Sequence, residues 1–306
     1  MLTSCPKLVV LSSLLALAAC SGAPGEQIAQ EDQAAGVWGP GGVGGGGFLV
    51  VPTRYSVSNS QAVKMLPSAT YYCLLDGVSG ALGGAGPFVV PNVNGAQSFA
   101  DIFDDGTDFW LISGVGVTAT ASCISWSNFT GPGVVASAVQ TTTRAPYTVV
   151  VESGNGSNQA GSVSMWAAGD AVCVLSALEG QMTGVSLGPT PGPYNDVSVV
   201  PDALPQGLLA LTNSPYLSAS ANCVTFPGRW SMASSTYILG SGYNQPESVA
   251  LPSRATALCG LSSLGGVLAS NGDGITIVPS GNGGQTASVS GGIGGGLVTC
   301  MPYAQP

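Results

Sequence analysis

The stretch Cys73-Leu74-Leu75-Asp76-Gly77-Val78-Ser79-Gly80-Ala81-Leu82 returns in altered form twice further along the chain. Around each copy a valine lies ten residues before the cysteine and a leucine lies two residues after it. An apolar residue follows the cysteine at plus five, a glycine at plus seven and another apolar residue at plus nine. The three aligned cysteines are Cys73, Cys173 and Cys259. Five columns in one register indicate a module that is repeated three times.

A second cysteine ends each copy, and an aromatic residue follows it three positions later. These cysteines are Cys123, Cys223 and Cys300, and the aromatic residues are Trp126, Phe226 and Tyr303. The segment before Cys123 alternates, since Val117, Ala119 and Ala121 share one face with it. Such alternation predicts a half-buried strand, and the small side chains predict closely packed layers with the disulfide between them.

The fold class predicted from these patterns is all-β. The chain contains 46 Gly and 21 Pro, which would interrupt helices, and no window shows a long amphipathic helical pattern. We expect three tandem, disulfide-bonded β-sandwich-like repeats over residues 48–135, 140–232 and 233–306. The length of each copy favours separate sandwiches in a row, and closure of the three copies around a pseudo-threefold axis is the alternative.

The first 19 residues have the features of a signal peptide. Lys7 precedes the apolar run from Leu8 to Ala19, which is too short to span a bilayer as a helix. The sequence Leu17-Ala18-Ala19-Cys20 resembles the lipobox of bacterial lipoproteins, and Ser21 follows it. This resemblance implies cleavage before Cys20, lipidation of Cys20 and anchoring in the outer membrane. Ordinary secretory cleavage near Ala19 is the alternative.

Residues 20–47 follow as a glycine-rich segment and are predicted to be a flexible, lipid-anchored tether. Export places the chain in an oxidising compartment, where disulfides persist. Without Cys5 and Cys20 six cysteines remain, two in each repeat. The repeat favours pairing within each copy among the many connectivities that are possible: Cys73 with Cys123, Cys173 with Cys223 and Cys259 with Cys300.

Charged residues make up 7% of the chain, which has a net charge of −9. Nucleic-acid binding depends on clustered Lys and Arg, so the sequence excludes nucleic acid as a partner. A sparsely charged surface suits a surface glycan, a protein partner or self-association. The repeats resemble Cys-x-Leu-x-x-Val/Leu-x-Gly repeats of secreted bacterial proteins of unknown function, and this resemblance implies no particular activity.

The chain contains no histidine, which excludes Ser-His-Asp and Cys-His catalysis. We therefore expect no enzymatic activity and no cofactor, with calcium as one exception to consider. Four carboxylates lie within eight residues at Asp101, Asp104, Asp105 and Asp108. Their oxygens are the ligands that calcium prefers, although an acidic turn between two strands explains the same cluster.

The aromatic residues Trp126, Phe226 and Tyr303 occupy equivalent positions and would form a sugar-binding platform if they were exposed. The alternative is that these residues pack against the disulfide or seal the edge of the core. A weak site in each copy would make binding multivalent. The sequence as a whole favours a non-enzymatic, outer-membrane or cell-surface lipoprotein with a structural or adhesive role, and the alternative function is an array of carbohydrate-binding β-modules.

Overall fold

The structure is a computed structural model that describes residues 51–82, 98–130, 147–152, 161–167, 171–180, 182, 196–201, 206–212, 217–225, 235–240, 245–280 and 283–303. Within these ranges the secondary structure consists of strands and one short 3-10 helix, η1 (Trp126–Thr130). The predicted all-β class is confirmed. No described segment forms a helix with the length and apolar character needed to cross a membrane. The predicted signal peptide, Cys20 and the tether lie outside the described residues.

Six strands fall within each predicted repeat. The first repeat contains β1 (Thr53–Ser58), β2 (Ala62–Pro67), β3 (Tyr71–Gly80), β4 (Phe99–Asp104), β5 (Asp108–Ser113) and β6 (Val117–Ser125). The second contains β7 (Tyr147–Glu152), β8 (Gly161–Ala167), β9 (Ala171–Gly180), β10 (Asp196–Pro201), β11 (Gln206–Thr212) and β12 (Leu217–Thr225). The third contains β13 (Ser235–Leu239), β14 (Ser248–Leu251), β15 (Ala257–Gly266), β16 (Gly274–Pro279), β17 (Gln285–Ser290) and β18 (Ile293–Pro302).

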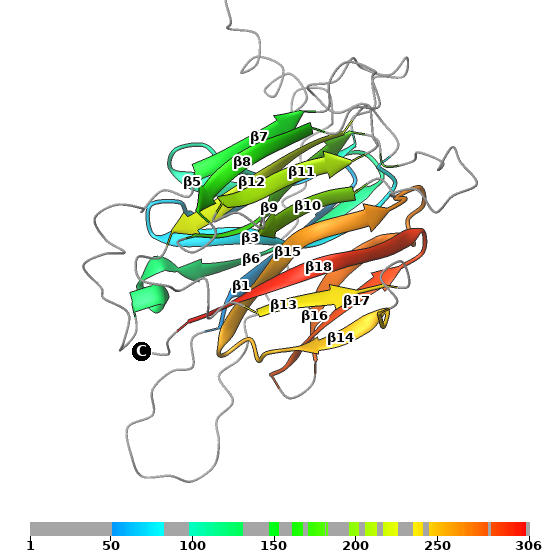
Figure 1. The fold of residues 1–306 in the computed structure, drawn as a ribbon. Coiled ribbons are helices and arrows are strands. Elements are labelled where there is room, and N and C mark those ends of the chain that lie inside the picture. The colour runs from blue at the N-terminus through cyan, green and yellow to red at the C-terminus, as the bar shows by residue number, and fades with distance from the viewer. Residues whose placement is uncertain are drawn as a thin grey trace, which may run out of the picture.

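These strands form three sheets of six strands, and each sheet combines halves of two repeats (Figure 1). The strand orders are β1-β6-β3-β16-β17-β14, β13-β18-β15-β10-β11-β8 and β2-β5-β4-β9-β12-β7. Three antiparallel seams join the halves, between β3 and β16, between β9 and β4, and between β15 and β10. Each repeat therefore shares a sheet with both of the others, and the three repeats close into a ring.

The favoured prediction of separate sandwiches in a row is therefore wrong. The shared sheets agree with the alternative, in which the three copies close into one body. The third and fourth strands of an isolated repeat would each form an open sheet edge. An open edge presents unpaired N–H and C=O groups that invite pairing with another chain. The seams pair the third strand of each repeat with the fourth strand of a neighbour, so none of these six strands remains an edge.

The larger hydrophobic core lies inside the repeats, where the two half-sheets of one repeat pack face to face. In the first repeat Leu75 of β3 is buried in the same cluster as Ile102 of β4 and Phe109 and Leu111 of β5. Burying one such side chain completely contributes about 1.5–3 kcal/mol. The alternating residues Val117, Ala119 and Ala121 of β6 also belong to this core, as the sequence predicts.

A second core lies where β3, β9 and β15 contact one another in the middle of the body (Figure 1). It is built from the faces of these strands that point away from the first core. The cluster contains Tyr72, Leu74, Ile124, Trp126, Val172, Val174, Leu258, Met301 and Tyr303. Because these side chains come from all three repeats, closure of the ring is what buries them.

The apolar column at plus nine also lies between the repeats. Leu82, Met182 and Leu268 are fully buried. The backbone N–H of Met182 donates to the carbonyl of Leu82 at 2.7 Å, and that of Leu268 donates to the carbonyl of Met182 at 3.1 Å. This column of the repeat therefore serves contacts between copies.

The glycine column at plus seven has a backbone explanation. Gly80, Gly180 and Gly266 adopt φ angles of 113°, 106° and 128°. Residues with a Cβ avoid this region, so each copy needs glycine at the end of its third strand. At Gly80 the backbone N–H donates to the carbonyl of Asp273 at 2.8 Å, which links the first repeat to the third.

The predicted disulfides Cys73–Cys123 and Cys259–Cys300 are present, with Cα–Cα distances of 4.1 and 4.0 Å. Cys173 is disulfide-bonded and lies directly opposite Cys223 in the β9–β12 ladder. Cys73 and Cys123 are opposite one another on neighbouring strands of one sheet, and both are buried in the core between the two half-sheets, where Sγ of Cys123 lies 3.9 Å from Sδ of Met65. The bond therefore staples the third strand to the sixth.

Candidate functional site

The acidic cluster forms the hairpin turn between β4 and β5. The Oδ1 atom of Asp104 accepts a hydrogen bond from the N–H of Gly106 at 2.8 Å. The Oδ1 atom of Asp105 accepts from the N–H groups of Thr107 and Asp108, both at 2.8 Å. Asp side chains commonly hold turns in this way, and Gly106 supplies a φ of 89°. The acidic-turn interpretation therefore describes the local structure.

Asp105 also holds a tryptophan. Its Oδ2 atom accepts a hydrogen bond from Nε1 of Trp110 at 2.8 Å. The hydrogen bonds from the backbone of Asp108, from the Trp110 indole and from the backbone of Thr107 lower the pKa of Asp105. The carboxylate therefore stays charged at neutral pH and fixes the edge of the indole ring.

A lysine from the neighbouring strand completes this surface. Nζ of Lys64 on β2 lies 2.7 Å from Oδ2 of Asp108, and the Lys64 side chain is 57% exposed. The hydrogen bond and the charge of Asp108 raise the pKa of Lys64. Asp108 itself is buried, so the ion pair satisfies its carboxylate.

Asp101 lies apart from the turn, at the seam between β4 and β9, opposite Ala177. Part of the residue surface is accessible, but burial of the carboxyl group raises the pKa of Asp101 to about 7. The buried residue Glu179 lies opposite Phe99 on the same face of this sheet. Protonation of Asp101 is therefore linked to the stability of the protein at this seam.

The structure does not bring the four aspartates together around one point. The part of the chain that the structure describes contains no group of three or more Asp, Glu, Cys or His placed to hold a metal ion. Asp104 and Asp105 direct oxygens at backbone N–H groups, and Asp108 pairs with Lys64. Calcium binding at this hairpin stays a prediction.

An aromatic row on the same face was missed by the sequence analysis. In the strand registers Phe103 lies opposite Trp110, and Trp110 lies opposite Lys64. Phe103 is 42% exposed and Trp110 is partly exposed. The neighbours Ile102, Phe109 and Leu111 point into the core, which sets the outward direction of the row. The alternation within β4 and β5 was a signal that could have found it.

The predicted platform of Trp126, Phe226 and Tyr303 is wrong for the two residues that are described. Trp126 is 8% exposed and its ring lies 5.3 Å from the ring of Tyr72, while Tyr303 is 6% exposed. Both are buried in the core between the repeats, whereas the disulfide cysteines of their repeats lie in the first core. Phe226 lies outside the described residues.

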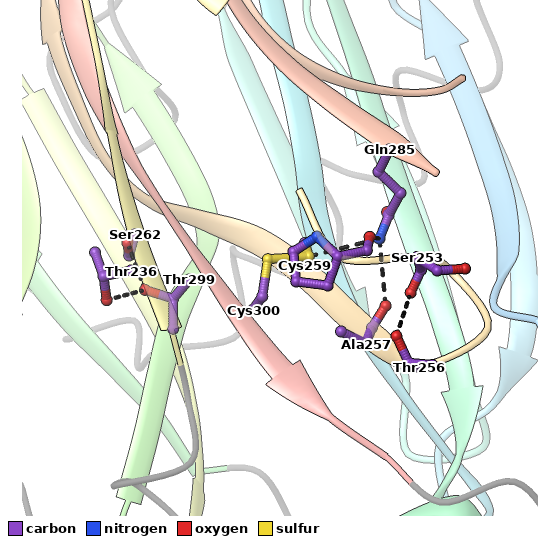
Figure 2. Close-up of a disulfide and its surroundings, with 10 residues drawn as sticks. Thr236, Ser253, Thr256, Ala257, Cys259, Ser262, Gln285, Thr299 and Cys300 are labelled. Carbon is purple, nitrogen blue, oxygen red and sulfur yellow. Dashed lines mark hydrogen bonds between the residues drawn. A yellow bond between two sulfur atoms is a disulfide. The ribbon is translucent and has the colours of Figure 1, made fainter. Parts of the chain in front are cut away.

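The surroundings of the third-repeat disulfide are structural (Figure 2). Nε2 of Gln285 donates to the carbonyls of Pro252 and Ala257 at 3.0 and 3.4 Å and approaches Sγ of Cys259 at 3.6 Å. On the other side, the hydroxyl of Thr299 donates to that of Ser262 at 2.9 Å. These bonds satisfy polar groups beside the disulfide.

The bulge residue of the third strand is polar and buried in all three repeats, and in the second repeat it is Ser176. Ser262 occupies this position in the third repeat, and Asp76 occupies it in the first, where its Oδ2 atom lies 3.2 Å from Nε of Arg54. The hydroxyl of Ser122 donates a hydrogen bond to the same Oδ2 atom of Asp76. A buried carboxylate needs partners, and the pairing with Arg54 explains why a charged residue can stand three positions after the first cysteine of the repeat.

Comparison with known protein families and with curated proteins gives no match for this chain. The candidate site is therefore defined by its own geometry. It consists of the outward row Phe103, Trp110 and Lys64 together with the turn carboxylates Asp104 and Asp105. This surface combines exposed aromatic area with fixed hydrogen-bonding groups, which suits binding.

Proposed function

We propose that this protein is a non-catalytic lipoprotein of the outer membrane, and that its β body has a structural or adhesive role at the cell surface or in the periplasm. The observation that carries the proposal is the closed ring of shared sheets, which is stapled by disulfides. Disulfides form and persist in an oxidising compartment, in agreement with export through the segment that ends at Cys20.

The structural use of three carboxylates supports a role without catalysis for these side chains. Asp105 holds a turn and an indole ring, Asp76 pairs with Arg54, and Asp108 pairs with Lys64. Catalytic carboxylates need access to a substrate and a pKa suited to proton transfer. The described hollow beside Cys300 is shallow and is lined by Ser235, Pro252, Thr256, Ala257, Cys300 and Pro302.

The anchor is tested by cell fractionation of Cys20→Ser with Cys5→Ser as the matched control. Cys5 lies in the predicted signal peptide, so its replacement should leave the protein in the outer-membrane fraction. Cys20→Ser should release the protein from that fraction, because it removes the thiol that carries the lipid. Retention of Cys20→Ser in the membrane would contradict the proposal.

The role is tested on cells that produce the wild-type protein or the released variant. Wild-type cells should sediment faster or attach more strongly to surfaces than cells that produce Cys20→Ser. Equal behaviour would exclude adhesion, and hydrolytic turnover that disappears in Asp104→Asn would exclude a non-catalytic role.

A second candidate function is carbohydrate binding. The observation that favours it is the exposed pair Phe103 and Trp110, in place of the aromatic residues selected from the sequence.

A further inference from the structure

We infer that the outward face of β4, β5 and β2 binds an uncharged saccharide, with Phe103 and Trp110 as the stacking surface. This inference gives the proposed adhesive role a ligand class and rests on that role for its biological setting. The binding itself requires only the folded body.

The row has the dimensions of a short saccharide. Phe103, Trp110 and Lys64 lie opposite one another on three neighbouring strands. Two strand spacings make the row about 10 Å long, comparable to a disaccharide. The aromatic rings offer apolar faces to the C–H groups of a sugar, and Lys64 and Asp105 offer polar groups at the rim.

The indole ring is preorganised. Asp105 accepts the Trp110 N–H at 2.8 Å and is itself held by the backbone N–H groups of Thr107 and Asp108. The residues on both sides of Trp110 along β5, Phe109 and Leu111, are anchored in the core. A ring that is fixed before binding loses little conformational freedom on binding, which favours affinity.

The charges select an uncharged ligand. Two carboxylates touch the row, since Asp105 accepts from Trp110 and Asp108 pairs with Lys64, and Lys64 is the one cation of the row. The whole chain carries a net charge of −9. An anionic saccharide would meet repulsion from the turn carboxylates, whereas a neutral one would accept and donate hydrogen bonds at the rim.

The exposed apolar area is too small for a protein partner. Phe and Trp side chains bury about 150–250 Å² each when fully covered. A stable protein interface needs about 800 Å² on each side. A small ligand fits the two-ring surface better than a second copy of the chain does.

The third repeat shows that the aromatic residues are not required by the fold. At the equivalent strand positions Val278 lies opposite Thr286, which lies opposite Ala250. The strands β16 and β17 have the same six-residue lengths as β4 and β5. The same sheet geometry is thus built with small side chains, so Phe103 and Trp110 are available for binding.

This comparison supplies the test variant. The double substitution Phe103→Val with Trp110→Thr gives the first repeat the outward residues of the third. The matched control is Val278→Ala with Thr286→Ala, which changes the equivalent surface in the third repeat. Thermal unfolding of both variants should stay close to that of the wild-type protein.

The probes are immobilised neutral oligosaccharides of two or more units and their uronic-acid or sialylated counterparts, presented to the full-length protein in detergent. The wild-type protein should bind at least one neutral probe, and the control variant should bind it equally. The Phe103→Val, Trp110→Thr variant should lose at least tenfold in affinity. A preference for acidic probes, absence of binding to every neutral probe, or equal binding by the double variant would overturn the inference. Self-association that disappears in the double variant without any glycan binding would also overturn it.

The outcomes separate this inference from the proposed function. Release of Cys20→Ser from the membrane tests the anchor and leaves glycan binding unaffected. If the wild-type protein is not membrane-anchored, the proposed anchor is contradicted. Glycan binding that depends on Trp110 would still support the ligand class in that case.

Discussion

Replacing Gly80 by alanine should strongly destabilise the protein. Gly80 has a φ of 113°, a region where a residue with a Cβ is strained by about 1–3 kcal/mol. A Cβ at this position would overlap the carbonyl oxygen of Gly116 and lie 3.0 Å from Cα of Val117. Because both are backbone atoms, the strands must shift, which costs about 1–3 kcal/mol more. The expected loss is therefore about 4 kcal/mol, a large part of the usual stability of a domain.

Gly106→Ala provides the matched control. Gly106 also has a positive φ, of 89°, but no atom lies within 4 Å of the position that a Cβ would take. Only the backbone strain applies, so the expected loss is about 1–2 kcal/mol. Urea unfolding followed by far-ultraviolet circular dichroism measures both values.

A loss in Gly80→Ala no greater than that in Gly106→Ala would refute the reasoning. It would show that the end of β3 tolerates a side chain, and that the positive φ angle is not the reason why glycine recurs at Gly80, Gly180 and Gly266. Since Gly80 donates to Asp273 across the seam, faster hydrogen exchange of β16 in Gly80→Ala would identify the seam as the damaged region.

Three further outcomes are expected. The fold raises the pKa of Asp101 to about 7, so the folded protein retains a proton that the unfolded chain releases near its ordinary pKa of 3.8. The free energy of unfolding should therefore fall as the pH rises through this window, by at most about 4 kcal/mol. Urea unfolding at several pH values measures this dependence, and Asp101→Asn should make it weaker. An equally strong pH dependence in Asp101→Asn would contradict the prediction. Replacing Cys73 and Cys123 together by alanine should lower the free energy of unfolding by about 2–4 kcal/mol, and calorimetry showing no change would argue against the staple. Buried Arg254 donates to the carbonyl of Pro52 at 2.6 Å. Arg254→Ala should therefore lower the free energy of unfolding by about 2 kcal/mol and speed hydrogen exchange in β1. Unaltered exchange would show that this contact does not hold the strand.

Local features of the fold could be predicted from the sequence because their causes are local. The alternation before Cys123 predicts strand β6, and the repeat predicts the disulfide between Cys73 and Cys123. The columns at plus seven and plus nine were visible as well. Their meaning was not, because a φ angle at Gly80 and a hydrogen bond from Met182 to Leu82 depend on residues far away along the chain.

The sharing of sheets could not be predicted for a related reason. The sequence of β3 is satisfied equally by a separate sandwich and by a sheet that continues into another repeat. The pairing of Ile275 with Val78 joins segments almost two hundred residues apart, and no local pattern specifies it. The cost of open edges decides between the two arrangements, and that cost appears only when the whole chain is considered.

The candidate site was predicted in part. The acidic turn at Asp104 and Asp105 follows from their spacing around Gly106. The outward direction of Trp110 does not, since it depends on the register with β2 and β4. The aromatic residues selected at equivalent positions, Trp126 and Tyr303, are buried because the closed ring needs apolar groups where its repeats meet.

The recurring and the varying positions of the repeat have different roles, and this difference changes the expected mode of binding. Positions that recur in all copies serve the closed fold, as Leu82, Met182 and Leu268 do. Positions on the outward faces are free to differ, and the row of Phe103 and Trp110 has no aromatic counterpart in the third repeat. Multivalent binding through one site in every copy, as expected from the sequence, therefore does not extend to this row. A single saccharide should bind for each protein molecule at this face, and the rigidity of the closed ring should favour affinity by holding the row flat before the ligand arrives.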